Sequence, residues 1–162
     1  MKNKNNNDFV EEIRRAKKAH LKWVSYAYGL IEGLPLEREQ VPVFETDCAF
    51  GHWYYGPGQV LNRLQVFRDL EEPHRELHQV YMRIFKILFQ DEGRGLWSRF
   101  FGRSAKQDGK KREQALNHFH ELRNHSTELI HGLDALEEQL RNMNDEEFSR
   151  IFGASGADRK KA

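Results

Sequence analysis

The sequence lacks several features that would assign it to common protein classes. It has one cysteine in 162 residues, so it cannot form an intrachain disulfide. No apolar run approaches the roughly 20 residues that a membrane-spanning helix needs, and residues 1–7 lack the apolar core of a secretion signal. With 26 basic and 25 acidic side chains, the net charge of +1 provides no field to hold a polyanion. We therefore expect a cytoplasmic protein that binds no nucleic acid and makes no membrane contact.

Proline is also scarce, and the composition favours helices. Only four prolines occur, and 38% hydrophobic with 31% charged residues is typical of a helical bundle with wide solvated faces. A length of 162 residues suits one domain with its own core. We predict an all-α fold, an antiparallel four-helix bundle with a short extra helix and an irregular cysteine-containing turn. The expected parts are a disordered tail at residues 1–8, the bundle at 9–143 and a flexible tail at 144–162.

The first helix is marked by apolar residues that recur at helical spacing from Phe9 to Ala27. Gly29 and Gly33 are expected to end this helix, because glycine disfavours the helical interior and is common just past a helix end. The following residues 35–47 read as an irregular connector with at most a short helical turn.

One polar residue, His20, lies on the apolar stripe of this first helix. It follows Ala16 by four residues and precedes Trp23 by three, so its imidazole is predicted to point into the core. A buried imidazole needs a polar partner.

Two further histidines lie in the helix that Pro73 opens. Proline suits the first turn of a helix, since its missing N–H would have no partner there. Before it, a short helix of about three turns is expected within residues 60–72. His74 and His78 are four residues apart and share one helix face, at a Cβ separation of about 5 to 6 Å. Tyr81 continues this stripe, so both imidazoles are expected to face inward, where they can chelate a metal.

The last helix is predicted from roughly Lys111 to Asn142 by a regular 3-4 repeat. The repeat has seven members: Phe119, Leu122, Ser126, Leu129, Leu133, Leu136 and Leu140. Such a stripe can pack along the bundle or against a second copy of the chain. Residues 91–112, basic and aromatic, are interpreted as an inserted loop that folds back on the bundle. Contact of this loop with a partner or an anionic membrane surface is the alternative.

Cys48 lies in the most turn-prone segment of the chain, among aromatic residues and glycines. With His20, His74 and His78 it supplies one thiolate and three imidazoles, a set that Zn²⁺ accepts in tetrahedral geometry. We predict one Zn²⁺ per chain at these residues. Four protein ligands leave no position for water or substrate, which argues against an enzyme. Because metal binding keeps the sulfur as the thiolate that oxidants attack, Cys48 is also the predicted redox-sensitive residue.

Several neighbouring residues receive supporting roles. Trp23 and Trp53 are expected to pack around the metal ligands and exclude water. Asp47 is interpreted as an acceptor that hydrogen-bonds a ligand imidazole, with a turn or capping role as the alternative. A second metal site is not expected from the histidines that flank the apolar stripe of the last helix, which have no cysteine to support them: His118, His120, His125 and His131.

Three segments stand in a fixed order: His20-x-x-Trp23, then Cys48-Ala49-Phe50-Gly51-His52-Trp53-Tyr54-Tyr55-Gly56-Pro57-Gly58, then Pro73-His74-Arg75-Glu76-Leu77-His78. This series resembles the chemoreceptor zinc-binding domain, known as CZB, in which a histidine on the first helix precedes a Cys-x-x-Gly-x-Trp segment and a Pro-His-x-x-x-His helix start. The resemblance implies a bacterial regulatory domain with a helical-bundle fold, commonly homodimeric, that binds zinc through the three histidines and the cysteine. It also implies association with chemoreceptors or diguanylate cyclases, and a response to zinc or to oxidants of the hypochlorous acid type.

The sequence contains no cyclase, methyl-accepting or PAS-like segment, so we interpret it as a stand-alone sensor domain. The expected function is to respond to zinc availability or cysteine oxidation and to signal to a partner through helix packing. Two alternatives stay open. A hemerythrin-like metalloenzyme would need two metals bridged by carboxylates, and a purely structural or zinc-buffering bundle would need no response at all.

Overall fold

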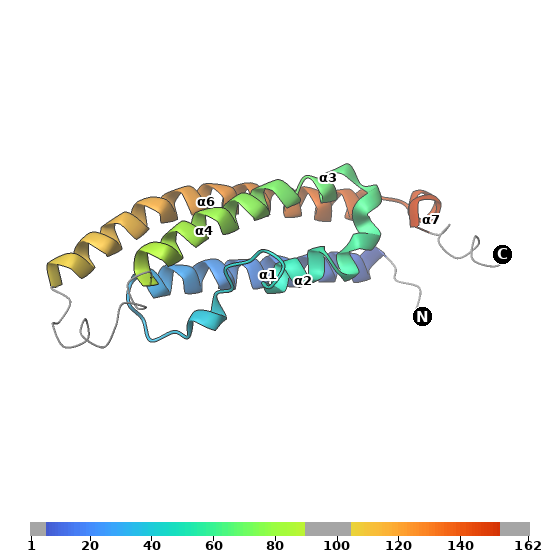
Figure 1. Ribbon diagram of the computed structural model, residues 1–162. Coiled ribbons are helices and arrows are strands. Elements are labelled where there is room, and N and C mark those ends of the chain that lie inside the picture. The colour runs from blue at the N-terminus through green and yellow to red at the C-terminus, as the bar shows by residue number, and fades with distance from the viewer. Residues whose placement is uncertain (1–5, 90–104, 153–162) are drawn as a thin grey trace, which may run out of the picture.

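The computed structural model describes residues 6–89 and 105–152, which form an elongated helical bundle (Figure 1). Three long helices run through it: α1 (Asn6–Ile31), α4 (Glu71–Phe89) and α6 (Ala105–Asn142). Three short helices lead into α4: α2 (Ala49–Tyr54), the 3-10 helix η2 (Pro57–Arg63) and α3 (Gln65–Arg68). Helix α2 packs against α1, and α3 packs against α6. The described residues contain no strand, so the all-α prediction is confirmed.

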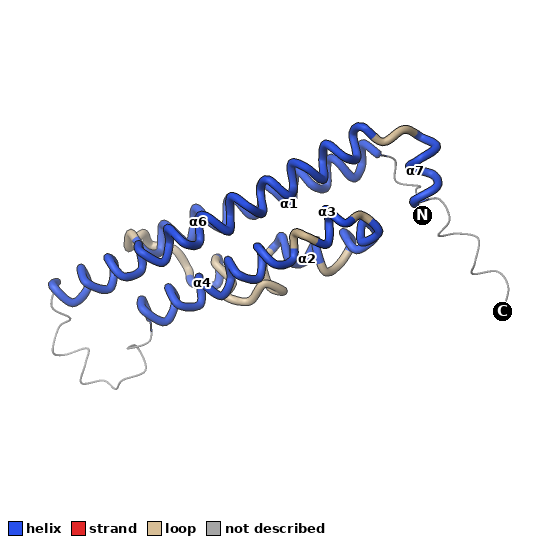
Figure 2. Tube along the Cα trace, turned by 90° about the horizontal axis from the view of Figure 1, so that it is seen from above, coloured by secondary structure: helices blue, strands red, loops and turns tan. Residues whose placement is uncertain are grey.

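Contacts from one end to the other fix α1 and α6 as antiparallel neighbours (Figures 1 and 2). At one end the side-chain amide of Asn6 donates to the backbone carbonyl of Leu140, near the C-terminus of α6. At the other end the Arg112 guanidinium pairs with Glu32 at 2.5 Å. Helix α6 also packs along α4, where Arg83 pairs with a carboxylate of α6 at 2.7 Å. The long helix α6 therefore lies against both helices that carry the candidate histidines.

The predicted apolar stripe of α6 is confirmed, because all seven of its residues are buried: Phe119, Leu122, Ser126, Leu129, Leu133, Leu136 and Leu140. The start of the helix was placed too late, at Lys111, since α6 already begins at Ala105. Residues 105–112 are mostly strong helix formers, and they outweigh the single Gly109 that suggested a loop.

The rest of the predicted insert, residues 91–104, lies outside the described residues. That this segment folds back on the bundle therefore stays a prediction, with contact to a partner or a membrane as the alternative. None of the described helices combines the length and the apolar character that a membrane crossing requires.

Helix α1 continues past Gly29 and ends at Ile31, two residues later. The stop comes from Gly33, whose φ of +76° is a conformation that residues with a Cβ rarely adopt. The Gly33 N–H bonds the Leu30 carbonyl at 3.1 Å, and the Leu34 N–H bonds the Gly29 carbonyl at 2.9 Å. These two bonds close the helix in the pattern that glycine permits.

The connector after α1 contains one short 3-10 helix, η1 (Arg38–Gln40), as expected. The segment after Cys48 is more regular than the predicted turn, since α2 starts directly behind the cysteine. The single helix predicted within residues 60–72 is instead divided into η2 and α3, with Leu64 extended between them. Helix α4 starts at Glu71, so Pro73 lies in its first turn, where no partner for its nitrogen is needed.

The predicted flexible tail at 144–162 contains a further helix, α7 (Asp145–Phe152). Its Phe148 and Phe152 rings lie 5.9 and 5.7 Å from the ring of Phe9 at the start of α1. At the other terminus α1 already includes residues 6–8, which were predicted as tail. Residues 1–5 and 153–162 lie outside the described part of the chain, and the division into domains stays a prediction.

Candidate metal centre

Three of the four predicted ligands converge inside the bundle. The ligand atoms of Cys48, His74 and His78 all lie within 4.8 Å of one another, and the three residues are only 0 to 3% exposed. The Cys48 Sγ lies 3.3 Å from the His74 Nε2. In a tetrahedral zinc site the bonds are ~2.3 Å long to sulfur and ~2.0 Å long to nitrogen, so two ligand atoms lie about 3.3 to 3.5 Å apart. The donor set therefore suits Zn²⁺, and the Cys48–His74 separation is close to the one that a tetrahedral site requires.

Local backbone structure places the cysteine. Cys48 is the N-cap residue of α2, and its sulfur accepts a hydrogen bond of 3.1 Å from the Gly51 N–H. The Cys48 thiol also lies 3.5 Å from the carbonyl oxygen of Glu45. A backbone N–H aimed at the sulfur favours the thiolate that a metal requires. The cysteine is therefore held by both the connector and the first turn of α2.

The two histidines of α4 are oriented by helix geometry and by one backbone acceptor. Their spacing of four residues brings the rings of His74 and His78 to 4.8 Å between centroids. The Nδ1–H of His78 donates to the Val43 carbonyl oxygen at 2.9 Å. Such a bond fixes the tautomer and leaves Nε2 as the nitrogen with a free lone pair. The role of Val43 could not be read from the sequence, because any residue type supplies the same carbonyl.

Burial sets the protonation states of these groups. It lowers the pKa of His78 to about 4 and that of His74 to about 2, the latter also through the neighbouring His78 and His20. Both rings are neutral at pH 7 and keep a lone pair for a metal. Burial raises the pKa of the Cys48 thiol to about 11, against the opposing effect of the Gly51 N–H. A cation is then the group that can hold Cys48 as a thiolate at neutral pH.

The fourth predicted ligand, His20, is buried nearby, but its imidazole contacts Ser126 instead of the three clustered ligand atoms. Its Nε2 lies 2.9 Å from the Ser126 Oγ on α6, and the residue is not part of the three-residue cluster. Burial, followed by the effect of His78, lowers the pKa of His20 to about 4, so this imidazole is neutral too. His20 also lines the same cleft as Cys48 and His78. Its role as a ligand stays a prediction.

Aromatic rings surround the centre, and the one nearest to His74 was not predicted. The Phe50 ring lies 4.5 Å from the His74 ring, while Trp53 packs behind Phe50 at 5.6 Å. Trp23 lies directly against His78, with ring centroids 4.7 Å apart. Phe50 lies two residues after the cysteine and three before Trp53, and both aromatic residues are buried. This spacing of three residues, which places two side chains on one helix face, was the signal that could have identified Phe50.

Asp47, the predicted hydrogen-bond acceptor for a ligand imidazole, is exposed. Its carboxylate accepts a bond of 3.0 Å from the Thr46 hydroxyl. The acceptor for His78 is the Val43 carbonyl instead. Asp47 acts on His78 only through its charge, which raises the pKa of that imidazole against the larger effect of burial.

A cleft of about 420 Å³ connects the centre to the surface between α1, η1 and the start of α2. Its inner wall contains His20, Cys48 and His78, and Trp23 and Gln40 also line it. Cys48 thus borders this cleft, although the residue itself is only 3% exposed.

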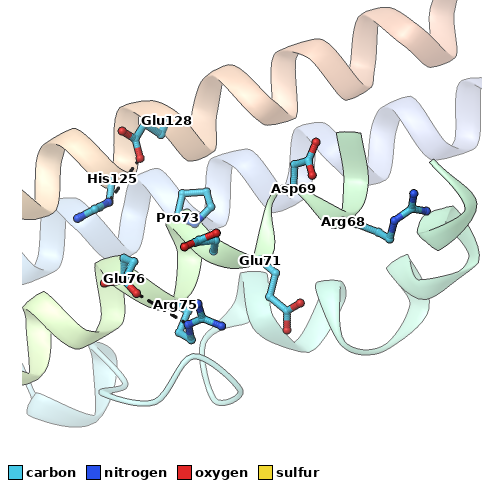
Figure 3. A pocket seen from close by; sticks show the side chains of 9 residues that line it. Arg68, Asp69, Glu71, Pro73, Arg75, Glu76, His125 and Glu128 are labelled. Carbon is cyan, nitrogen blue, oxygen red and sulfur yellow. Dashed lines mark ion pairs between the residues drawn. The ribbon is translucent and has the colours of Figure 1, made fainter. Parts of the chain in front are cut away.

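A second pocket, of about 610 Å³, lies where α3, the start of α4 and the middle of α6 meet (Figure 3). Its walls carry charges of both signs, and the ion pairs drawn there stay within single helices. His125 pairs with Glu128 at 3.5 Å, and Arg75 pairs with Glu76 at 3.9 Å. His125 is thus directed to a carboxylate of its own helix and not to another histidine.

A family model described as the chemoreceptor zinc-binding domain, CZB, matches residues 20–85. The matched segment extends from His20 through the cysteine and the whole of the His74 and His78 pair. No curated protein and no solved structure matches the chain. The buried Cys48, His74 and His78 cluster provides the donor set that a zinc-binding family requires. Residues 20–85 are thus similar to the chemoreceptor zinc-binding domain family, the same family that the sequence motifs resemble.

Proposed function

We propose that this chain is a regulatory domain in which Cys48, His74, His78 and His20 hold one Zn²⁺. The observation that carries the proposal is the convergence of a thiol and two neutral imidazoles within 4.8 Å inside the bundle. A mixed sulfur and nitrogen donor set is the one that zinc accepts in closed structural sites. His20 is the remaining imidazole on the same cleft, and it completes the set of four.

Such a site supports regulation rather than catalysis. Four protein ligands leave no coordination position for substrate, and the cluster of described residues contains no carboxylate that could bridge two irons. A hemerythrin-like enzyme is therefore the weaker interpretation.

The proposed response is a change in helix packing. The bound ion would stabilise the Cys48 thiolate and join residues from three elements, α1, α2 and α4. Oxidation of Cys48 through the cleft, or loss of zinc, removes this link. The same sulfur accepts the Gly51 N–H, so a change at Sγ also alters the start of α2. We propose that this change is read by a chemoreceptor or diguanylate cyclase partner, and that the domain acts as a homodimer in the cytoplasm.

Metal analysis tests the metal site. Protein purified from zinc-replete cells should carry about one zinc per chain, and Cys48→Ala or His74→Ala should lose most of it. Protein that is free of zinc, or that is loaded with iron, would contradict the proposal.

Hydrogen exchange tests the response. Removal of zinc, or treatment with hypochlorous acid, should speed amide exchange in α2 and in the facing turns of α1 and α4. Cys48→Ala protein should show no further change on oxidation. If exchange and oligomeric state are the same with and without zinc, the structural or zinc-buffering interpretation is the better one.

A further inference from the structure

The stripe of α6 that faces the core contains one polar residue, Ser126, among six apolar ones. A buried hydroxyl is unfavourable unless it is hydrogen-bonded, and Ser126 is 7% exposed. Its partner is the imidazole of His20, with 2.9 Å between Oγ and Nε2. Apart from tyrosine, tryptophan and cysteine, the buried polar side chains in the described part of the chain are four: His20, His74, His78 and Ser126. Ser126 is therefore the one of these four that the proposed ligand set leaves unexplained.

We propose that Ser126 is a positioning residue of the metal centre, which acts through His20; this inference rests on the proposed zinc site. A histidine that binds a metal uses one ring nitrogen, and its orientation and tautomer are set by what the other nitrogen contacts. His78 follows this rule, with Nδ1 bonded to the Val43 carbonyl and Nε2 left free. In His20 the bond to Ser126 engages Nε2, so Nδ1 is the nitrogen left for the metal.

The contact joins a fourth helix to the centre. Helix α6 contributes none of the four proposed ligands, and Ser126 lies outside the residues that match the family. Ser126 nevertheless faces His20 on α1, in the same buried stripe whose leucines pack in the core. Through this bond, zinc binding at His20 is linked to the packing of the helix that leads to the C-terminal end of the chain.

Zinc affinity in matched variants tests the proposal, measured by competition with a chromophoric chelator on the whole chain. Ser126→Ala should weaken zinc binding about tenfold or more, the effect typical of removing a partner of a ligand histidine. The effect should disappear in a His20→Ala background. Thr127→Ala is the matched control, because the Thr127 hydroxyl bonds the Arg123 carbonyl within α6 at 2.9 Å and is exposed. It should leave zinc affinity unchanged.

Two variants with side chains of similar shape, Ser126→Thr and Ser126→Val, still test the role of the hydroxyl if Ser126→Ala fails to fold. Ser126→Thr retains the hydroxyl and Ser126→Val does not, although the two side chains have similar volume. Only S126V should lose affinity. Ligation through Nδ1 requires the Nε2–H tautomer, in which His20 donates to the Ser126 Oγ, so ¹⁵N NMR should show this tautomer in the wild-type chain and its loss in S126V.

Equal zinc affinity of S126T and S126V would overturn the inference. So would a loss in Ser126→Ala that persists at the same size without His20. If the wild-type chain itself binds no zinc, it is the proposed function that fails, and the tautomer measurement still tests the contact between Ser126 and His20.

Discussion

Gly51→Ala should damage the metal centre although Gly51 is not a ligand. A Cβ added at this position would lie 1.8 Å from the backbone carbonyl oxygen of Glu45, where real contacts are essentially never below 3.0 Å. Either the segment before Cys48 or the first turn of α2 must then move by at least about 1.2 Å. The neighbouring atom is backbone, so no side-chain rotation relieves the clash.

That movement is large compared with what a metal site tolerates. Ligand distances in such sites are held to within about 0.2 Å, and the Gly51 N–H itself bonds the Cys48 sulfur at 3.1 Å. Gly51→Ala should therefore lower zinc affinity by at least about tenfold, or 1.4 kcal/mol, and approach the affinity of Cys48→Ala. Crowding of this kind typically also costs about 1 to 3 kcal/mol of stability.

The assay is zinc competition on folded protein, with the helix content checked by circular dichroism. Gly109→Ala is the matched control, because a Cβ there meets nothing within 4 Å. It should keep wild-type affinity and gain stability, as alanine is the better helix former. If Gly51→Ala is folded and binds zinc as tightly as the wild type, the sulfur is not held by this turn as we describe.

Three further predictions concern protonation and the C-terminal helix. In zinc-free protein the free energy of unfolding should fall as the pH falls below about 6.5, by up to about 4 kcal/mol per pH unit. The reason is that His20, His74 and His78 take up protons in the unfolded chain, whereas in the folded chain their lowered pKa values keep them neutral. Urea denaturation with a chelator at several pH values measures this slope, and a flat profile between pH 6.5 and 4.5 would refute it. Zinc binding at pH 7 should release about one proton, which comes from the Cys48 thiol with its raised pKa, because the imidazoles are already neutral. Calorimetry in buffers of different ionisation enthalpy counts the released protons. A release of two or more protons would contradict these protonation states. Phe148→Ala should speed hydrogen exchange in α7, because it removes a ring packed against the start of α1, yet leave zinc affinity unchanged.

The parts of this structure that periodicity controls were predictable from the sequence. The leucine stripe of α6 and the shared face of His74 and His78 follow from 3.6 residues per turn, and both are buried as predicted. Helix ends were less predictable. Gly29 and Gly109 both suggested breaks, and both lie within helices because the surrounding residues and their packing outweigh one glycine.

The finer contacts of the site depend on tertiary structure that no local pattern encodes. The acceptor for His78 is the backbone carbonyl of Val43, 35 residues away. The partner of His20 is Ser126, 106 residues away. The stripe pattern showed a serine among leucines, but only the antiparallel register of α1 and α6 identifies the residue that it faces.

The zinc coordination itself is the central claim, and X-ray absorption at the zinc edge tests it directly. We predict one sulfur at about 2.3 Å and three nitrogens at about 2.0 Å in the zinc-loaded chain. The sulfur should be missing in Cys48→Ala, and one imidazole should be missing in His20→Ala. A spectrum of the wild-type protein without a zinc–sulfur distance would contradict the account.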